Sequence, residues 1–313
     1  MWLSVATVVL ELTVPVSSRA ASSATPAARA WETPPGWTTT RGGDDGKLIR
    51  VTTLAASGPG SLAEALATAG PRKIVFTVAG LIDLNGHSLV VRGPHVPIAG
   101  ETPPDPGVTL IGAGINVATH NVIMRHVRVR PGAGSRPKRS GWEVDALSTV
   151  GGAHDVIVDH CSFSWATDEN LSATGPRFQG QTPDEWRHNT SHRVTFSHCL
   201  VGECLHDSAH GKGPHSMGSL IHDNVCDMAI FGNLYISNNA RNPLFKGGAR
   251  GVFVNNVVQN PGGGIAYGLV PEEWEGREWQ SGAMAIVGNV VHKGPSSGNL
   301  PFVLLVGPGR CDL

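Results

Sequence analysis

Charged residues are scarce in this chain of 313 residues. Lysine and arginine number 24, aspartate and glutamate number 25, and the formal net charge is −1. Proteins that bind nucleic acid carry a basic patch, so this balance argues against a nucleic-acid partner.

Long helical patterns are also few, whereas glycine (40) and proline (22) are plentiful. This composition is typical of a fold built from short strands and turns.

Asn-Gly and Asp-Gly pairs, which mark β-hairpins, are nearly absent, although short β patterns are frequent. Six segments share one template: apolar-x-x, then His or Asn, then apolar-x-apolar. The template residue stands at His126, His160, His198, Asn233, Asn256 and Asn289. The intervals of 34, 38, 35, 23 and 33 residues correspond to solenoid coils with loops of different length. We therefore predict an all-β, single-domain parallel β-helix with its functional loops on one face; a β-sandwich is the alternative.

The repeated histidines and asparagines are interpreted as turn residues. Asparagine tolerates left-handed backbone geometry and can stack in a hydrogen-bonded ladder, so its repetition at one register fits a turn between two sheets. We expect His160 and His198 to be structural for the same reason, and Asp159 beside them likewise. The five cysteines include no CxxC pair, which argues against a cysteine-ligated zinc site. Cys161 and Cys199 follow the template histidines and are expected to stack in the core.

Residues 1–30 are interpreted as an atypical signal or export segment, and residues 31–313 as the β-helix domain. The stretch from Trp2 to Val16 is mostly apolar, and Ala28-Arg29-Ala30 resembles a cleavage site, but a positive leading region is missing. The apolar run is too short to span a bilayer, so we expect no membrane partner. The chain stops soon after an apolar segment, residues 303–306, and the domain could be truncated there. We expect a secreted monomer.

Two clusters of charge suggest chemistry. Asp145 opens one strand pattern, and Asp168 and Glu169 lie in the loop after the next one. If these segments belong to adjacent coils, their carboxylates approach one another and form an oxygen-rich site of the kind that calcium prefers. The segment from Arg241 to Lys246 holds two cations close together, with Pro243 and a following Gly-Gly pair fixing the backbone. Cations displayed by a protein of nearly zero net charge suggest an anionic substrate.

These motifs together resemble the pectate lyases of polysaccharide lyase family 1. The resemblance covers roughly residues 42–294. Its most specific blocks are Val158-Asp-His-Cys-Ser-Phe-Ser-Trp165 and the segment from Arg241 to Gly248. Supporting blocks are Gly58-Pro-Gly-Ser-Leu62, Lys73-Ile-Val-Phe76, Asn121-Val-Ile-Met-Arg-His126, Val144-Asp-Ala-Leu147, Asp168-Glu-Asn-Leu171 and Gly218-Ser-Leu-Ile221.

The resemblance implies a right-handed parallel β-helix that cleaves polygalacturonate by β-elimination with Ca²⁺ as cofactor. It implies that Asp145 and Asp168 are calcium ligands, and that Arg241 is the catalytic residue. Glu169 is expected as a third ligand, because the family's further aspartate is replaced by Ser172 here.

Lys246 matches the family's second cation, which binds substrate carboxylate. We expect Lys212, His215 and Asn242 to join it. The lysine that is common before the Ser-Leu-Ile block is absent, and Met217 stands in its place.

Two questions stay open at the level of sequence. Arg241 is either the base that removes the C5 proton or a charged group that stabilises the developing negative charge while hydroxide acts as base, because guanidinium has a pKa above roughly 12. The activity also has alternatives: a calcium-independent pectin lyase or other uronate lyase, a hydrolase such as polygalacturonase, or a non-catalytic carbohydrate-binding β-helix.

Overall fold

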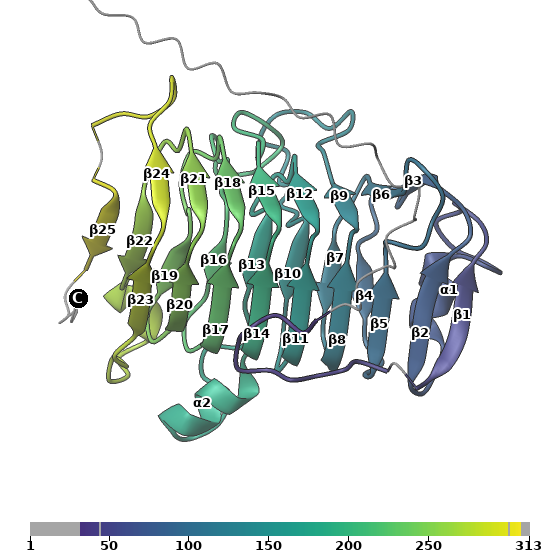
Figure 1. Ribbon diagram of the computed structural model, residues 1–313. Helices are drawn as coiled ribbons and strands as arrows, with labels where there is room; N and C mark the ends of the chain where they lie inside the picture. The colour runs from purple at the N-terminus through teal and green to yellow at the C-terminus, as the bar shows by residue number, and fades with distance from the viewer. Residues whose placement is uncertain (1–31, 44, 300, 308–313) are drawn as a thin grey trace, which may run out of the picture. The chain divides into compact units, whose positions relative to one another are not determined.

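The computed structural model describes residues 32–43, 45–299 and 301–307, so the predicted export segment lies outside the described residues. Three parallel sheets dominate the described chain, and consecutive strands rotate among them (Figure 1). The predicted right-handed parallel β-helix is confirmed. Every paired strand is parallel to its neighbour, and the sandwich alternative, which needs hairpins, is excluded for this region.

The first sheet has nine strands, and each of the other two has eight. In spatial order the first contains β1 (Lys47–Val51), β2 (Arg72–Phe76), β5 (Val96–Ala99), β8 (His120–Arg125), β11 (His154–Asp159), β14 (His192–Ser197), β17 (Cys226–Phe231), β20 (Arg250–Val254) and β23 (Ala283–Val287). The second contains β25 (Val303–Val306), β22 (Ile265–Gly268), β19 (Leu244–Lys246), β16 (Leu220–Ile221), β13 (Leu171–Ala173), β10 (Leu147–Thr149), β7 (Ile115–Val117) and β4 (Leu89–Val91). The third contains β24 (Val290–His292), β21 (Val257–Gln259), β18 (Leu234–Ile236), β15 (Leu200–Gly202), β12 (Ser162–Ser164), β9 (Arg128–Arg130), β6 (Val108–Ile111) and β3 (Gly80–Asp83).

Alternation along each short strand builds the core. In β2 the pattern of buried and half-buried residues alternates strictly, so every second side chain enters the interior of the coil. Equivalent inward positions stack from coil to coil, as for Phe163, Val201 and Tyr235, which are paired along the third sheet and are fully buried. The apolar core is therefore one column that runs through the solenoid.

The helices are short. α1 (Leu62–Ala67) is capped by Ser61 and buries Leu62, Ala65 and Leu66 at the β1 end of the solenoid. α2 (Pro183–Asn189) begins with a reciprocal capping box between Thr182 and Glu185. η1 (Pro271–Trp274) is a 3-10 turn in the loop after β22. Among the described residues, no helix combines the length and apolar character that a bilayer span requires.

The turn between the first and third sheets corrects the predicted register. Leu200 lies opposite Leu234, and the backbone N–H of Cys199 donates to Asn233 Oδ1. The asparagines therefore align with the cysteines rather than with the histidines. The histidines occupy the preceding position, where the backbone is left-handed (φ 53° at His160, 51° at His198). Glycine or Asn255 fills that position in later coils. The repeated sequence pattern treated the histidine position and the following position as one, because it was defined only by polarity and spacing.

The predicted asparagine ladder is nevertheless present. The Asn256 Oδ1 atom accepts hydrogen bonds from the backbone N–H and the side-chain amide of Asn233, at 2.9 and 3.0 Å. Asn289 receives the same pair from Asn256, both at 2.9 Å. These amides replace the inward-facing Cys161 and Cys199, which are free thiols in the core as expected.

Candidate functional site

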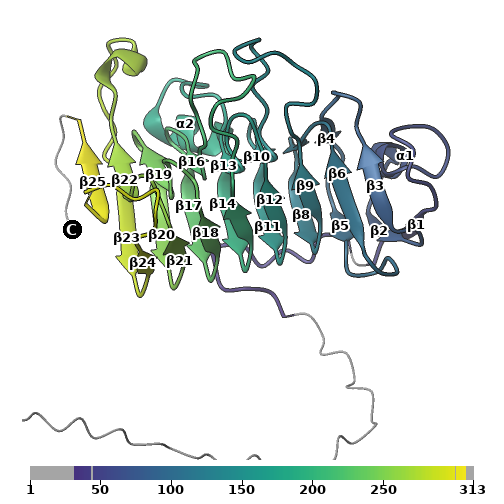
Figure 2. The same cartoon turned by 90° about the horizontal axis from the view of Figure 1, so that it is seen from above.

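The second sheet carries an open cleft on its outer face. The longer loops rise on this side of the solenoid, above β10, β13, β16 and β19 (Figure 2). The cleft has a volume of about 370 Å³, and its lining includes the outward residues Asn116 and Ser148 of β7 and β10. Four acidic residues also line it, Glu143, Asp145, Asp168 and Glu169. The repeat thus places on one surface groups that lie more than twenty residues apart in the sequence.

The three predicted calcium ligands are brought together. Ligand oxygens of Asp145, Asp168 and Glu169 lie within 4.8 Å of one another. Asp145 and Glu169 precede the paired strands β10 and β13, and the Glu169 backbone N–H donates to Asp145 Oδ1 at 3.0 Å. The predicted approach of acids from adjacent coils is therefore present. Such a group of oxygen donors fits a hard cation.

The electrostatics of the group also favour a cation. Burial raises the pKa of the Asp145 carboxyl well above its usual range, and the neighbouring Asp168 carboxylate raises it further. Burial also pushes the pKa of Asp168 upward, but the hydrogen bond from His215 and the charges of His215, His210 and Arg241 hold it below its ordinary value. Carboxylates held this close repel one another, and a bound cation would remove that cost.

Arg241 lies beside this acidic group. The residue before it, Ala240, pairs with Met217, and Met217 pairs with Glu169 on the next coil. The backbone of Arg241 itself is left-handed (φ 57°). Its guanidinium forms an ion pair with Glu169, and its side chain is 27% exposed. Burial lowers the pKa of Arg241, against the opposing influence of Asp168, Asp145 and Glu273. Met217, whose backbone pairs with Glu169 and with Ala240, brings no charge to this group.

Lys246 belongs to a second cluster, farther along the same outer face. It ends β19, directly after Phe245, which pairs with Ile221 of β16, and its amino group pairs with Glu273 from the η1 loop. Arg177 donates to the same Glu273 oxygen at 2.6 Å and to Asp223 at 2.8 Å. The first glycine after Lys246 has φ 57°, and a β-carbon there would collide with Asp223. The Gly-Gly pair thus allows a left-handed backbone and a close approach to Asp223.

The other predicted substrate-binding residues have different surroundings. His215 Nε2 lies 2.8 Å from Asp168 Oδ1, and its ring stacks on His210 with centroids 3.7 Å apart. Lys212 lies in the exposed loop between these two histidines, and its backbone N–H donates to His210 Nδ1. His215 thus contacts a predicted metal ligand.

Asn242 does not face the cleft. Its side chain is buried, and its amide donates to the backbone carbonyls of Asn238 and Gly263 at 3.4 and 2.9 Å. The prediction that Asn242 binds substrate does not fit this position, because its polar atoms are already used to fasten neighbouring coils. Sequence proximity to Arg241 was a misleading signal here, since Asn242 lies in the turn before β19 and its side chain is directed into the protein.

Glu273 and Arg177 were not foreseen. Glu273 lies in a loop 27 residues beyond its partner Lys246, and Arg177 is 46 residues from Asp223. No local spacing connects such residues. The histidines on either side of Lys212 offer one local signal, since His210 Nε2 and His215 Nε2 lie 3.6 and 2.8 Å from Asp168 Oδ1.

Fold and site together define a class: a right-handed parallel β-helix with an outer cleft in which an acidic group meets a partly buried arginine. Sequence relatives place the chain more narrowly. It is 33% identical over 262 residues to a protein named probable pectate lyase C from Aspergillus terreus, covering 83% of this chain and 53% of that protein. A protein of the same name from Emericella nidulans is 34% identical over 227 residues, covering 72% and 46%. The predicted resemblance is confirmed: the chain is related to the pectate lyases over most of its length.

The relationship has limits. The chain spans about half the length of the curated relatives that it matches. No family model matches it. Solved structures that resemble it include pectate lyase Bsp165PelA from Bacillus sp. N165 in complex with trigalacturonate (15% identity, TM-score 0.42, covering 84% of this chain and 88% of that one) and pectate lyase pelN from Paenibacillus sp. 0602 (11%, TM-score 0.46, 82% of each chain). Likeness at this level supports no conclusion, so the fold assignment rests on the strand pairing.

Proposed function

We propose that this chain is the catalytic part of a secreted, calcium-dependent pectate lyase that cleaves polygalacturonate by β-elimination. The observation that carries the proposal is the position of Arg241 against Asp145, Asp168 and Glu169 at the end of an open cleft. The kinship with pectate lyases supplies the substrate class. The net charge of −1 and the shortness of the basic runs, such as residues 136–139, argue against a nucleic-acid partner, and we expect the enzyme to be a monomer.

The acidic group fits calcium in its donor set. Asp145, Asp168 and Glu169 would hold the ion, since all offer carboxylate oxygens within 4.8 Å of one another. Bound there, calcium would neutralise substrate carboxylate and make the C5 proton more acidic. Two present contacts must loosen for this: His215 hydrogen-bonds Asp168, and Glu169 pairs with Arg241. Release of Glu169 to the ion would free the Arg241 guanidinium for substrate.

Arg241 then acts on the proton next to the uronate carboxylate. Burial lowers its pKa, which increases the fraction of neutral guanidine at alkaline pH and supports a role as base. Asp168, Asp145 and Glu273 act in the opposite direction, so neutralising the first two with calcium would let the effect of burial dominate. Charge stabilisation by a protonated Arg241, with hydroxide as base, is the second candidate mechanism, favoured by its present ion pair with Glu169.

Lys246 binds substrate at the other cluster. Its side chain is 15% exposed and is held in place by Glu273. A polymer with a carboxylate on every sugar can meet Arg241 and Lys246 through different sugars. A substrate carboxylate that binds Lys246 must share it with Glu273 or displace it.

Product chemistry tests the proposal. The protein is incubated with polygalacturonate in calcium and in EDTA, and the oligosaccharides are analysed by mass spectrometry. Elimination gives products that are lighter by one water than those of hydrolysis, and we expect them only with calcium. Hydrolytic products would contradict the lyase assignment, and unsaturated products formed equally in EDTA would contradict the calcium assignment. No products from a folded protein would support the binding-module alternative.

A further inference from the structure

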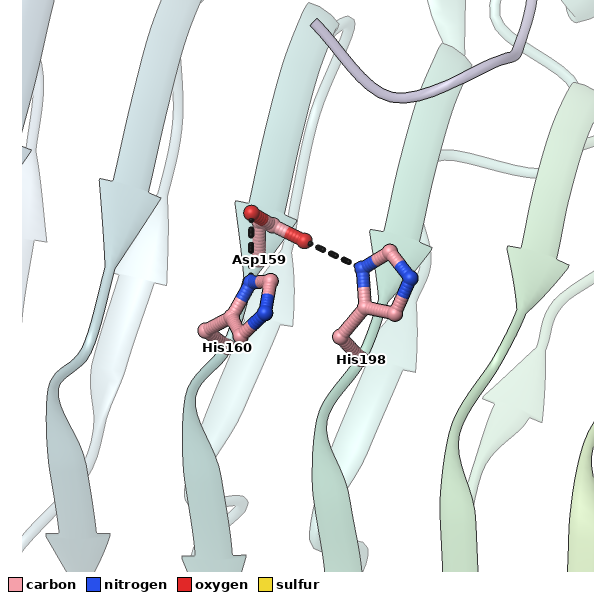
Figure 3. A group of neighbouring side chains, drawn as sticks. All are labelled: Asp159, His160 and His198. Carbon is pink, nitrogen blue, oxygen red and sulfur yellow. Dashed lines mark hydrogen bonds and ion pairs between the residues drawn. The ribbon is translucent and has the colours of Figure 1, made fainter. Parts of the chain in front are cut away.

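A second group of metal-binding side chains lies away from the cleft, in the turn between the first and third sheets. Asp159 ends β11, His160 follows it, and His198 is the equivalent turn residue one coil later. Both imidazole rings turn Nδ1 toward the Asp159 carboxylate, each toward a different oxygen (Figure 3). The distances are 2.8 Å for His160 and 2.9 Å for His198.

These separations are close to those of neighbouring ligands around one ion. Nitrogen and carboxylate ligands lie about 2.0–2.2 Å from a zinc-like ion, so two ligands at right angles are about 3 Å apart. One ligand atom each from Asp159, His160 and His198 lies within 4.8 Å of the others. An expansion of a few tenths of an ångström would admit an ion between the two rings and the carboxylate.

The group is built to hold its geometry. The Asp159 carboxylate is buried, and Ser197 Oγ donates to its Oδ1 at 2.6 Å, an outer contact of the kind that orients metal ligands. Asp159 and Ser197 are paired across β11 and β14. The ring of His160 stacks on those of His126 and His198, with centroids 5.1 and 4.7 Å apart. Paired strands and stacked rings therefore fix the spacing of the two histidines.

An ion can reach this group from solvent. The side chains of His160 and His198 are 48% and 44% exposed, whereas that of Asp159 is 3% exposed. The present contacts indicate that Nδ1 carries the proton in each ring, because Nδ1 faces a carboxylate oxygen. On binding, each imidazole proton moves to the exposed Nε2, and the freed Nδ1 lone pair coordinates the ion. The step needs no other reactant.

We propose that Asp159, His160 and His198 bind one divalent transition-metal ion, of the zinc, copper or nickel type, which fastens two successive coils. Two imidazoles and one carboxylate suit such ions, whereas calcium prefers oxygen ligands alone. The site is separate in chemistry and place from the acidic group at the cleft. It extends the structural role predicted for these residues and does not depend on the proposed lyase activity.

Zinc titration tests this inference. The full chain is treated with a chelator, dialysed and titrated with zinc chloride by isothermal calorimetry, and zinc-dependent melting is followed by circular dichroism. The variants are His160→Asn and His198→Asn. Asparagine suits this backbone, because Asn255 occupies the equivalent left-handed position in a later coil. The matched control is His126→Asn, the same turn position one coil earlier (φ 55°) and outside the three-residue group.

A second control addresses the other histidine-containing group, Asp168 with His210 and His215. We expect saturable binding of zinc that weakens at least about tenfold in His160→Asn and His198→Asn and persists in His126→Asn and His215→Gln. The zinc-induced rise in melting temperature should follow the same order. No saturable binding by the wild type, or unchanged binding in His160→Asn and His198→Asn, would overturn the proposal. Loss of binding in His215→Gln alone would place the zinc at the cleft and overturn it as well.

Discussion

Arg241 is held between opposing influences at the scale of a single residue. Its left-handed backbone directs the guanidinium toward Glu169, and burial lowers its pKa while three acids act to raise it. In the same way burial and Asp168 raise the pKa of Asp145. Burial and neighbouring charges shift the pKa values of these residues unfavourably. Such conflicts concentrate at functional sites, where the rest of the fold supplies the stability.

Asp145→Asn should stabilise the metal-free protein. Because the folded-state pKa of Asp145 is raised, its contribution to stability is present below the unfolded pKa of about 3.9 and is lost as pH rises through the folded pKa. At neutral pH the carboxylate is therefore a cost that asparagine removes. We expect the melting temperature in EDTA to rise by roughly 2–4 °C, and the gain on adding calcium to vanish.

The control for this change is Asp184→Asn, at a side chain that is 98% exposed. Circular dichroism melting of both variants, with calcium and with EDTA, provides the measurement. A lower melting temperature of Asp145→Asn in EDTA, or an undiminished calcium effect, would count against the acidic group as a calcium site.

At the scale of elements, stacks of like side chains join successive coils. Asparagines fill the inward position of the later coils. In the earlier coils histidines stack in two columns. One column lies in the turn and contains His126, His160 and His198, and the other lies along β8, β11 and β14 and contains His120, His154 and His192. Because a coil cannot bury its faces alone, these contacts between coils are what set the register.

Asn256→Ala should be strongly destabilising. Its Oδ1 accepts two bonds from Asn233, and its amide donates to the Ile230 carbonyl at 3.1 Å and to Asn289. Alanine would leave a buried N–H and a buried carbonyl without partners, at about 1–3 kcal/mol each. Urea unfolding should therefore show a loss of about 2–5 kcal/mol.

The neighbouring Asn255→Gly is the matched control, because Asn255 has a left-handed backbone that glycine adopts freely. We expect it to change the free energy of unfolding by less than about 1 kcal/mol. Equal losses in the two variants would show that the ladder hydrogen bonds are not the stabilising feature.

The histidine column should make the fold sensitive to acid. Burial lowers the pKa of His192 below its usual value of 6.5, with smaller contributions from neighbouring groups. A depressed histidine pKa gives stability that is present above the unfolded pKa and is lost as pH falls through the folded pKa. The melting temperature of the wild type should therefore decline below about pH 6.5, and His192→Gln should reduce the slope.

The exposed His87→Gln is the control for this comparison. Melting temperatures of the three proteins across the acidic range test the idea. A slope in His192→Gln equal to that of the wild type would contradict the assignment of acid sensitivity to this column.

For the whole molecule, the sequence predicts the architecture well, because solenoid coils repeat a pattern that can be read locally. Spacing alone indicated the β-helix, and the acids at Asp145 and Asp168 followed from adjacent coils. The same reasoning misplaced Asn233 by one position, since a turn holds two polar positions side by side and spacing cannot tell them apart.

The rest of the site depends on contacts between distant loops. The pairing of Lys246 with Glu273 and of Asp168 with His215 is set by how loops of different coils fold over the sheet. Burial of Asn242 depends on the path of the turn before β19. A short motif contains neither the contacts between distant loops nor the direction of a side chain in a turn. The sequence therefore indicated the charged residues but not the residues that contact them.

The most direct test of the account is the initial rate of unsaturated product formation from polygalacturonate, followed by ultraviolet absorbance at alkaline pH with calcium. Wild type is compared with Arg241→Ala and with Arg250→Ala, whose arginine is exposed and bonds only a backbone carbonyl among the contacts described. We predict a calcium-dependent rate that falls by about 10²–10⁴-fold in Arg241→Ala and is unchanged in Arg250→Ala. A folded Arg241→Ala protein that retains the wild-type rate would contradict the central role of Arg241.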